Sequence, residues 1–229
     1  MAKIMLGSLA GAISGALGND VFSHGRHGYY IRKRVVPTKA FNIYTIKVRN
    51  ILTGLSRAWG GLSPEQQAAW NTFAQANPIT DRLGQKQVLF GAGAFTQLNA
   101  RIVFAGDTPI AVPPTINAPA PLTTLTAIAD ASAHTCVLTT APTPLGANYR
   151  LWIEVAMSLA PGVEYVSNLY KLVAVSAKNQ ATGLGIGAAL ETRSGTLLTG
   201  ESVDYRVSVM DSRTGRLSGA KHYQAAVVA

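Results

Sequence analysis

The chain has 229 residues, of which 48% are hydrophobic and 14% are charged. This ratio excludes an intrinsically disordered protein and favours one large packed domain or two ordinary ones. The formal net charge is +9, yet residues 1–105 hold 12 Lys or Arg against 3 Asp or Glu, whereas residues 106–229 hold 8 of each. Since the excess charge lies in one half only, a uniformly basic nucleic-acid coat is excluded, and a neutral module joined to a segment that faces an acidic partner is predicted.

The first 18 residues are apolar and rich in glycine. The spacing of Gly7, Gly11 and Gly15 is typical of paired membrane helices. However, the apolar run ends at Asn19, short of the about 20 residues that cross a bilayer. We therefore predict a Gly-rich arm that lies along another protein surface, and no membrane partner.

Two short β-prone runs follow in the basic part of the arm. Residues 21–24 and 29–32 flank Gly25-Arg26-His27-Gly28, a pattern typical of a β-hairpin. Pro37 ends the second run because proline has no N–H to donate to a neighbouring strand. Residues 1–37 are thus predicted to form a Gly-rich basic arm and hairpin.

Helical periodicity begins after this proline. From Phe41 to Trp59, apolar residues recur at steps of three and four, which predicts a helix. Gly60-Gly61 is expected to stop this helix through a left-handed C-cap.

Two further helices are predicted before residue 106. Ser63-Pro64-Glu65-Gln66 combines an N-cap, a first-turn proline and a capping box, and Pro78 closes the helix that it begins. The third helix is expected from about Gly91 to Ala105. Because isolated helices of this length are marginal in water, residues 38–106 are predicted to be a helical anchoring region that packs on itself or on a partner.

The period changes from helical to alternating after a proline-rich stretch. Five of the 11 prolines lie between Pro109 and Pro121, so residues 107–121 are interpreted as an extended linker. Residues 122–229 contain seven short strand-like runs with apolar and polar side chains in alternation, and Gly185–Leu190 is one of them. This pattern is typical of a β-sandwich.

The spacing from Leu198 to Tyr205 resembles that at the start of strand F in fibronectin type III modules, whereas the Cys-Trp-Cys pattern of immunoglobulin domains is absent. The predicted fold class is α+β with two modules. The first comprises the arm, the β-hairpin and short helices, and the second is a C-terminal all-β fibronectin-like or immunoglobulin-like sandwich at residues 122–229.

The sequence lacks the residues that an enzyme needs. It contains no Gly-x-Ser-x-Gly, His-Glu-x-x-His or phosphate-loop motif. Cys136 is the single cysteine, which excludes an internal disulfide and a Cys-based zinc site. His24 and His27 offer two metal ligands without a third, and Glu154 and Glu164 are interpreted as strand-edge charges. We expect no catalytic residue, no cofactor and no metal.

The basic segment is the one positive signal for a binding function. From Val21 to Pro64 there are eight Lys or Arg and no Asp or Glu. Clustered cations with aromatic neighbours suit a nucleic-acid backbone and its bases, but they suit an acidic protein surface as well. We favour the protein surface and keep nucleic acid as the alternative. The candidate partner-binding residues are Arg26, Tyr29, Tyr30, Arg32, Lys33, Arg34, Lys39, Lys47, Arg49 and Arg57.

An ordered series of short motifs resembles a family of tailed-bacteriophage proteins. Residues 13–23 and 28–37 follow that family's succession of Ser-Gly-x-x-Gly, Tyr/Phe-Ser, Gly-x-Tyr-x-Arg-x-Arg and Val-Pro. Ser56-Arg57-Ala58-Trp59 and Gln67-Ala68-Ala69-Trp70 extend the resemblance, which covers about residues 10–105. The chain departs from the family at residues 39–44, where an apolar excess replaces a Pro/Gln/Ala-rich helix start and indicates a partner contact of its own.

The resemblance implies a non-enzymatic virion structural protein. We expect an auxiliary head protein, a decoration or minor capsid protein, that docks by its basic N-terminal half while the β-sandwich projects. Its expected partners are other virion proteins, major capsid or tail subunits, in a symmetric assembly of several copies. The alternatives are a component of the tail or of the head–tail connector, or a nucleic-acid-binding module that uses the basic segment.

Overall fold

The computed structural model describes residues 2–3, 13–25, 28–35, 42–80, 84–115, 117–143, 145–159, 163, 166 and 168–228. Contacts between residues divide the chain into two compact units, the N-terminal unit Met1–Lys47 and the C-terminal unit Val48–Ala229. The boundary between them falls inside helix α1 (Ile43–Gly60). The finer division at residues 37, 106 and 121 stays a prediction.

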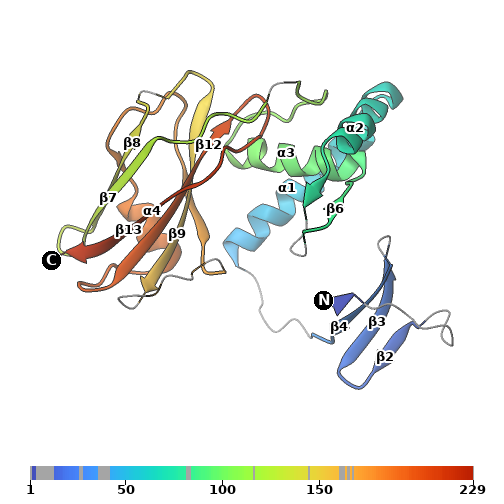
Figure 1. Cartoon of the computed structure of the whole chain (residues 1–229), viewed down its shortest axis with the longest axis horizontal. Coiled ribbons are helices and arrows are strands. Elements are labelled where there is room, and N and C mark those ends of the chain that lie inside the picture. The colour runs from blue at the N-terminus through green and yellow to red at the C-terminus, as the bar shows by residue number, and fades with distance from the viewer. Residues whose placement is uncertain are drawn as a thin grey trace. The chain divides into compact units, whose positions relative to one another are not determined.

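The N-terminal unit contains a small antiparallel sheet. Its strands are β1 (Ala2–Lys3), β2 (Gly15–Leu17), β3 (Asp20–Gly25) and β4 (Gly28–Lys33), in the order β1-β4-β3-β2 (Figure 1). The predicted hairpin is confirmed, because β3 pairs with β4 from Asp20 opposite Lys33 to Gly25 opposite Gly28. Two residues of its predicted loop, Arg26 and His27, lie outside the described residues, as does most of the predicted arm.

The three predicted helices are confirmed as α1, α2 (Pro64–Ala76) and α3 (Gly91–Phe104). The capping box at the start of α2 is complete: the Ser63 hydroxyl accepts a hydrogen bond from the Gln66 N–H, and the Ser63 N–H donates to the Gln66 side chain. The expected left-handed cap at the end of α1 is wrong, since neither Gly60 nor Gly61 has a positive φ. The Gly61 N–H instead donates to two carbonyl groups of the last helical turn.

The helices share an aromatic core. Trp70 of α2 is fully buried, and its ring meets Phe73 and Phe95 edge-on. Leu55 is the one residue of α1 that is buried. A two-stranded ribbon, β5 (Ile79–Thr80) with β6 (Lys86–Gln87), joins α2 to α3.

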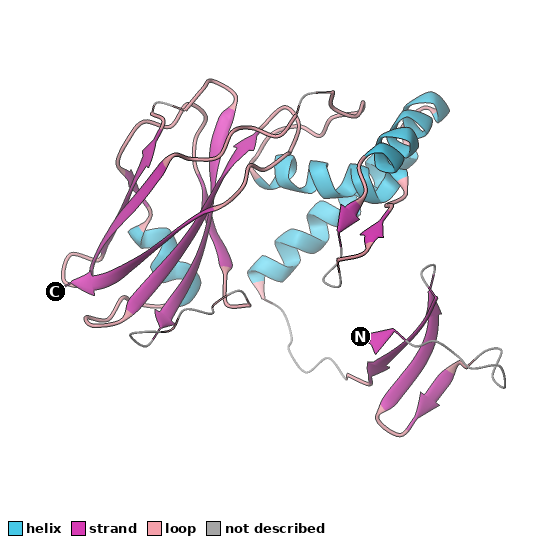
Figure 2. Ribbon diagram, viewed as in Figure 1, coloured by secondary structure: helices cyan, strands magenta, loops and turns pink. Residues whose placement is uncertain are grey.

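A seven-stranded sheet curls around the main core of the C-terminal unit (Figure 2). The strands are β7 (Thr124–Asp130), β8 (Thr135–Ala141), β9 (Tyr149–Leu159), β10 (Lys171–Val175), β11 (Leu184–Gly185), β12 (Ser202–Asp211) and β13 (Lys221–Val228). Their order is β10-β9-β12-β13-β7-β8-β11. Neighbours are antiparallel except β13 and β7, which pair in parallel over two residues. Helices α1, α2 and α3 all precede this mainly antiparallel sheet in the sequence, and the chain is α+β, as predicted.

One predicted strand is a helix. The run Gly185–Leu190 contributes only Gly185 to β11, and helix α4 (Gly187–Ser194) follows. Ile186 and Leu190 are both buried in the core and lie four residues apart, the spacing of one face of a helix. Gly187 fits here because a Cβ at this position would lie 2.5 Å from the carbonyl oxygen of His134.

The proline-rich stretch makes specific contacts within the C-terminal unit. Trp70 Nε1 donates to the carbonyl of Ala111 at 2.9 Å, and the fully buried Asn99 side chain exchanges two hydrogen bonds with the backbone of Ile110. These bonds hold residues 110–111 against α2 and α3.

Candidate partner-binding surface

The structure places the predicted partner-binding residues on two elements. Tyr29, Tyr30, Arg32 and Lys33 lie on β4 with Arg34 directly after it, whereas Lys47, Arg49 and Arg57 lie on α1. All six described cations are exposed, and both tyrosines are half-buried. Arg26 and Lys39 lie outside the described residues.

The register of β3 and β4 separates the basic cluster between two faces. Successive residues of a strand point to opposite faces, so Tyr30 and Arg32 share one face while Tyr29 and Lys33 share the other. On the second face, the rings of Tyr29 and His24 are 4.7 Å apart between centroids. A flat partner on one face therefore meets half of the β4 cluster.

The N-terminal sheet has no buried side chain among the residues that the structure describes. Its larger apolar side chains are half-buried, namely those of Val21, Phe22, Tyr30 and Ile31. A sheet of this size needs an apolar face covered by another layer to be stable in water. The described part of this unit thus leaves the apolar side chains of both faces incompletely covered.

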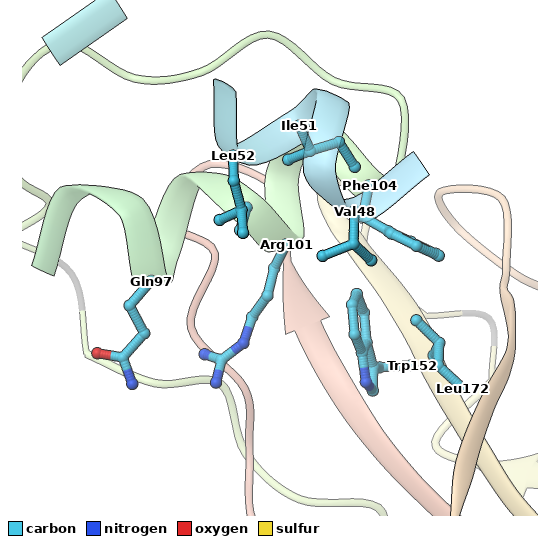
Figure 3. Close-up of a pocket in the computed structure, with 9 residues that line it drawn as sticks. Val48, Ile51, Leu52, Gln97, Arg101, Phe104, Trp152 and Leu172 are labelled. Atoms are coloured by element: carbon cyan, nitrogen blue, oxygen red, sulfur yellow. The ribbon is translucent and has the colours of Figure 1, made fainter. Parts of the chain in front are cut away.

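Helix α1 carries a second uncovered apolar surface. Val48 is 46% and Leu52 is 44% exposed, although both belong to the apolar face that predicted the helix. Beside them lies a hollow of about 300 Å³, which we call the α1 hollow (Figure 3). Its lining residues are Val48, Ile51, Leu52, Gln97, Ala100, Arg101, Phe104, Trp152 and Leu172.

The α1 hollow is lined by residues of helices α1 and α3 and of strands β9 and β10 of the curled sheet. Trp152 of β9 packs against Phe104 of α3, with ring centroids 5.7 Å apart. The sequence did not lead us to assign Trp152 to a site. The sequence feature that could have identified Trp152 is its position between Arg150 and Glu154, because a large aromatic residue there shares a strand face with two charged residues.

Arg101 supplies the positive charge of the α1 hollow. It extends from α3 between Gln97 and Trp152 (Figure 3), and its Nη1 donates to the Gly215 carbonyl at 3.2 Å. Burial lowers the pKa of its guanidinium, and the negative charge of Glu154 opposes that shift. Glu154 itself pairs with Arg206 at 2.6 Å between Oε2 and Nε.

A polar cluster covers another part of the outer sheet face. The Arg206 guanidinium lies 4.2 Å from the Tyr170 ring centroid, and the Tyr170 hydroxyl lies 3.0 Å from His222 Nδ1. Burial and a hydrogen bond to Asp204 raise the pKa of Tyr170 to about 12, so this phenol stays protonated near neutral pH. Glu164, which the sequence led us to interpret with Glu154 as a strand-edge charge, lies outside the described residues.

The remaining histidine and cysteine candidates contact single partners. His134 Nδ1 lies 2.7 Å from Glu191 Oε1, and Cys136 Sγ lies 3.0 Å from the Tyr205 hydroxyl in the core. Within the described ranges there is no group of three or more His, Cys, Asp or Glu side chains able to hold a metal ion. Among the same residues, no helix combines the length and apolar character needed to cross a bilayer.

We found no match to this chain among protein-family models, curated proteins or solved structures.

Proposed function

We propose that the protein is a non-enzymatic structural protein of a bacteriophage virion, an auxiliary head protein that docks through its basic N-terminal half. The observation that carries this proposal is the N-terminal sheet, whose described residues include exposed cations and no buried side chain. A sheet in this condition gains its missing apolar cover from a partner. Residues 1–47 hold 7 Lys or Arg against 1 Asp, so the partner surface is acidic.

We further propose that the curled sheet is a fibronectin-like or immunoglobulin-like sandwich that projects from the shell. Side chains from the strands of the curled sheet contribute to one core. Seven strands in about 100 residues, with alternating burial along β7 and β8, support this proposal. Tyr205 is fully buried in β12, but its hydroxyl meets Cys136 instead of the upstream backbone that a tyrosine corner would use.

Mass spectrometry of purified virions tests the proposal. The polypeptide is expected in intact particles, in several copies, and electron microscopy of labelled particles is expected to place it on the head. Signal on the tail or at the head–tail junction would favour the tail or connector alternative. Particles without the polypeptide would refute the virion assignment.

A nucleic-acid-binding function is the second candidate, because each face of β4 carries one tyrosine and one cation. If nucleic acid lies along one face of the sheet, Arg32→Ala and Lys33→Ala have different effects, since these side chains point to opposite faces. The substitution on the contacting face would reduce the slope of log affinity against log salt by about 1, and the other would leave it unchanged. Absence of DNA binding at low salt excludes this candidate.

A further inference from the structure

The α1 hollow is an apolar site with one cation at its edge. Val48, Ile51 and Leu52 of α1 form one wall, and Phe104 and Trp152 form another. At about 300 Å³ the hollow is at the lower end of the range for small-molecule sites. Since Val48 and Leu52 are exposed at its rim, the apolar surface continues beyond the hollow onto α1.

Arg101 is the one charged residue among those that line the hollow. Arg49 is exposed on α1, and no acidic residue occurs between Val21 and Pro64. Glu154 is the carboxylate whose negative charge acts on Arg101, and it is engaged by Arg206 and by Trp152 Nε1. Within the described part of the chain, no carboxylate lies within ion-pair distance of Arg101.

We propose that the α1 hollow docks an amphipathic helix of a partner protein, with apolar side chains in the hollow and an acidic side chain beside Arg101. The hollow is lined by α1, α3, β9 and β10. Apolar grooves receive the apolar face of such a helix through side chains three and four residues apart. Charge complementarity selects an acidic partner, because the guanidinium presents several donors and, within the part of the chain that the structure describes, donates one hydrogen bond, to the Gly215 carbonyl.

This inference rests on the proposed docking function, since it names the chemistry of the docked partner. The docking function and the occupation of the α1 hollow can be refuted independently of each other. Incorporation is measured on virions, whereas occupation of the hollow is measured on the purified full chain.

The probe is a fluorescein-labelled 18-residue helical peptide with Leu at positions i, i+3, i+4 and i+7 and Glu at the flanking positions. Fluorescence anisotropy is expected to show saturable binding to the full chain. A peptide with Lys in place of every Glu is expected to bind about tenfold more weakly, the effect of reversing the charge that faces Arg101.

Two substitutions locate the peptide. Leu52→Glu is expected to weaken binding of the acidic peptide at least about tenfold, because it places a charge in the apolar rim. Arg101→Gln is expected to remove most of the preference for Glu over Lys peptides. Thr53→Glu is the matched control, since Thr53 is exposed on α1 and lines no part of the hollow, and its effect is expected to be small.

Circular dichroism and thermal unfolding establish that each variant is folded. If Leu52→Glu unfolds the chain, Leu52→Ser and Val48→Ser replace it, with a smaller expected loss of affinity. The proposal is overturned if the acidic peptide does not bind, if Glu and Lys peptides bind equally, or if Thr53→Glu weakens binding as much as Leu52→Glu does.

Discussion

Gly215 lies where the loop between β12 and β13 touches α3. Its φ is +67°, and a Cβ at this position would lie 2.3 Å from the carbonyl oxygen of Leu98. Any side chain therefore meets both a left-handed backbone and fixed backbone atoms. We expect Gly215→Ala to lower the free energy of unfolding by about 2–4 kcal/mol in urea denaturation.

Gly200→Ala is the control that separates the two causes. Gly200 also has a positive φ, +86°, but nothing lies within 4 Å of its added Cβ. Only the backbone preference acts there, so a loss of about 1 kcal/mol is expected. Equal losses in the two variants would show that the close approach to Leu98 contributes nothing.

Cys136 and Tyr205 form a buried pair that makes stability depend on alkaline pH. Burial raises the pKa of the Cys136 thiol, and the hydrogen bond with Tyr205 only partly opposes this. Because the unfolded thiol loses its proton above about pH 8.5 while the folded thiol keeps it, stability is complete below that pH and falls as pH rises. The loss continues until the folded thiol ionises.

Unfolding in urea between pH 7.5 and 9.5 measures this effect. Relative to wild type, Cys136→Ala is expected to lose less stability as pH rises, although its stability at pH 7.5 is lower because a buried side chain is truncated. Parallel pH profiles for the two proteins would contradict the predicted shift of the thiol.

The start of α2 is stabilised by hydrogen bonds between its N-cap Ser63 and its first-turn residue Gln66. Ser63→Ala removes the hydroxyl that accepts the Gln66 N–H at 3.2 Å and breaks the reciprocal box. We expect the free energy of unfolding to fall by about 1 kcal/mol. Ser56→Ala, at an exposed position inside α1, is expected to leave stability unchanged or slightly raised, because alanine favours a helix interior.

Helix α1 shows how an element can form without complete burial. Its apolar residues predict an inner face, yet Leu55 is its single buried residue and Leu52 stays 44% exposed. Periodicity reports which side chains share a face, and it does not report whether a neighbour in the same chain covers that face. The uncovered part of α1 is the surface to which we assign a partner.

The two units of the whole molecule are expected to differ in local stability. The described residues of the N-terminal unit include no buried side chain, whereas β9 and β12 hold several fully buried ones. Opening of β3 and β4 exposes little apolar surface, so it costs less free energy than opening of the main core. In the isolated protein, amide hydrogen exchange is expected to be much faster in β3 and β4 than in β9 and β12.

Virions supply the complementary measurement. Protection of β3 and β4 is expected to rise in assembled particles, because a docked partner covers the sheet. Strong protection of these strands in the free monomer would contradict an N-terminal unit that depends on its assembly.

Local patterns in the sequence determined much of the fold. The capping box at Ser63, the Gly25–Gly28 loop and the apolar–polar alternation within residues 122–229 each depend on neighbours a few residues apart. They therefore predicted α2, the hairpin and strands such as β9. The charge imbalance likewise required no structure. All six of the described basic candidates are exposed, as solvated cations are expected to be.

The tertiary structure decided what these elements do to one another. The pattern of Gly185–Leu190 predicts a strand, but in the structure Ile186, the N-cap of α4, and Leu190, one turn later, are both buried in the core. The α1 hollow joins Leu52, Arg101 and Trp152, which are separated by about 50 residues at each step. Local propensity carries no information over that distance, because such contacts depend on the packing of whole elements. The sequence predicted a basic docking half from its charge pattern alone. Only the folded chain located an apolar hollow beside Arg101.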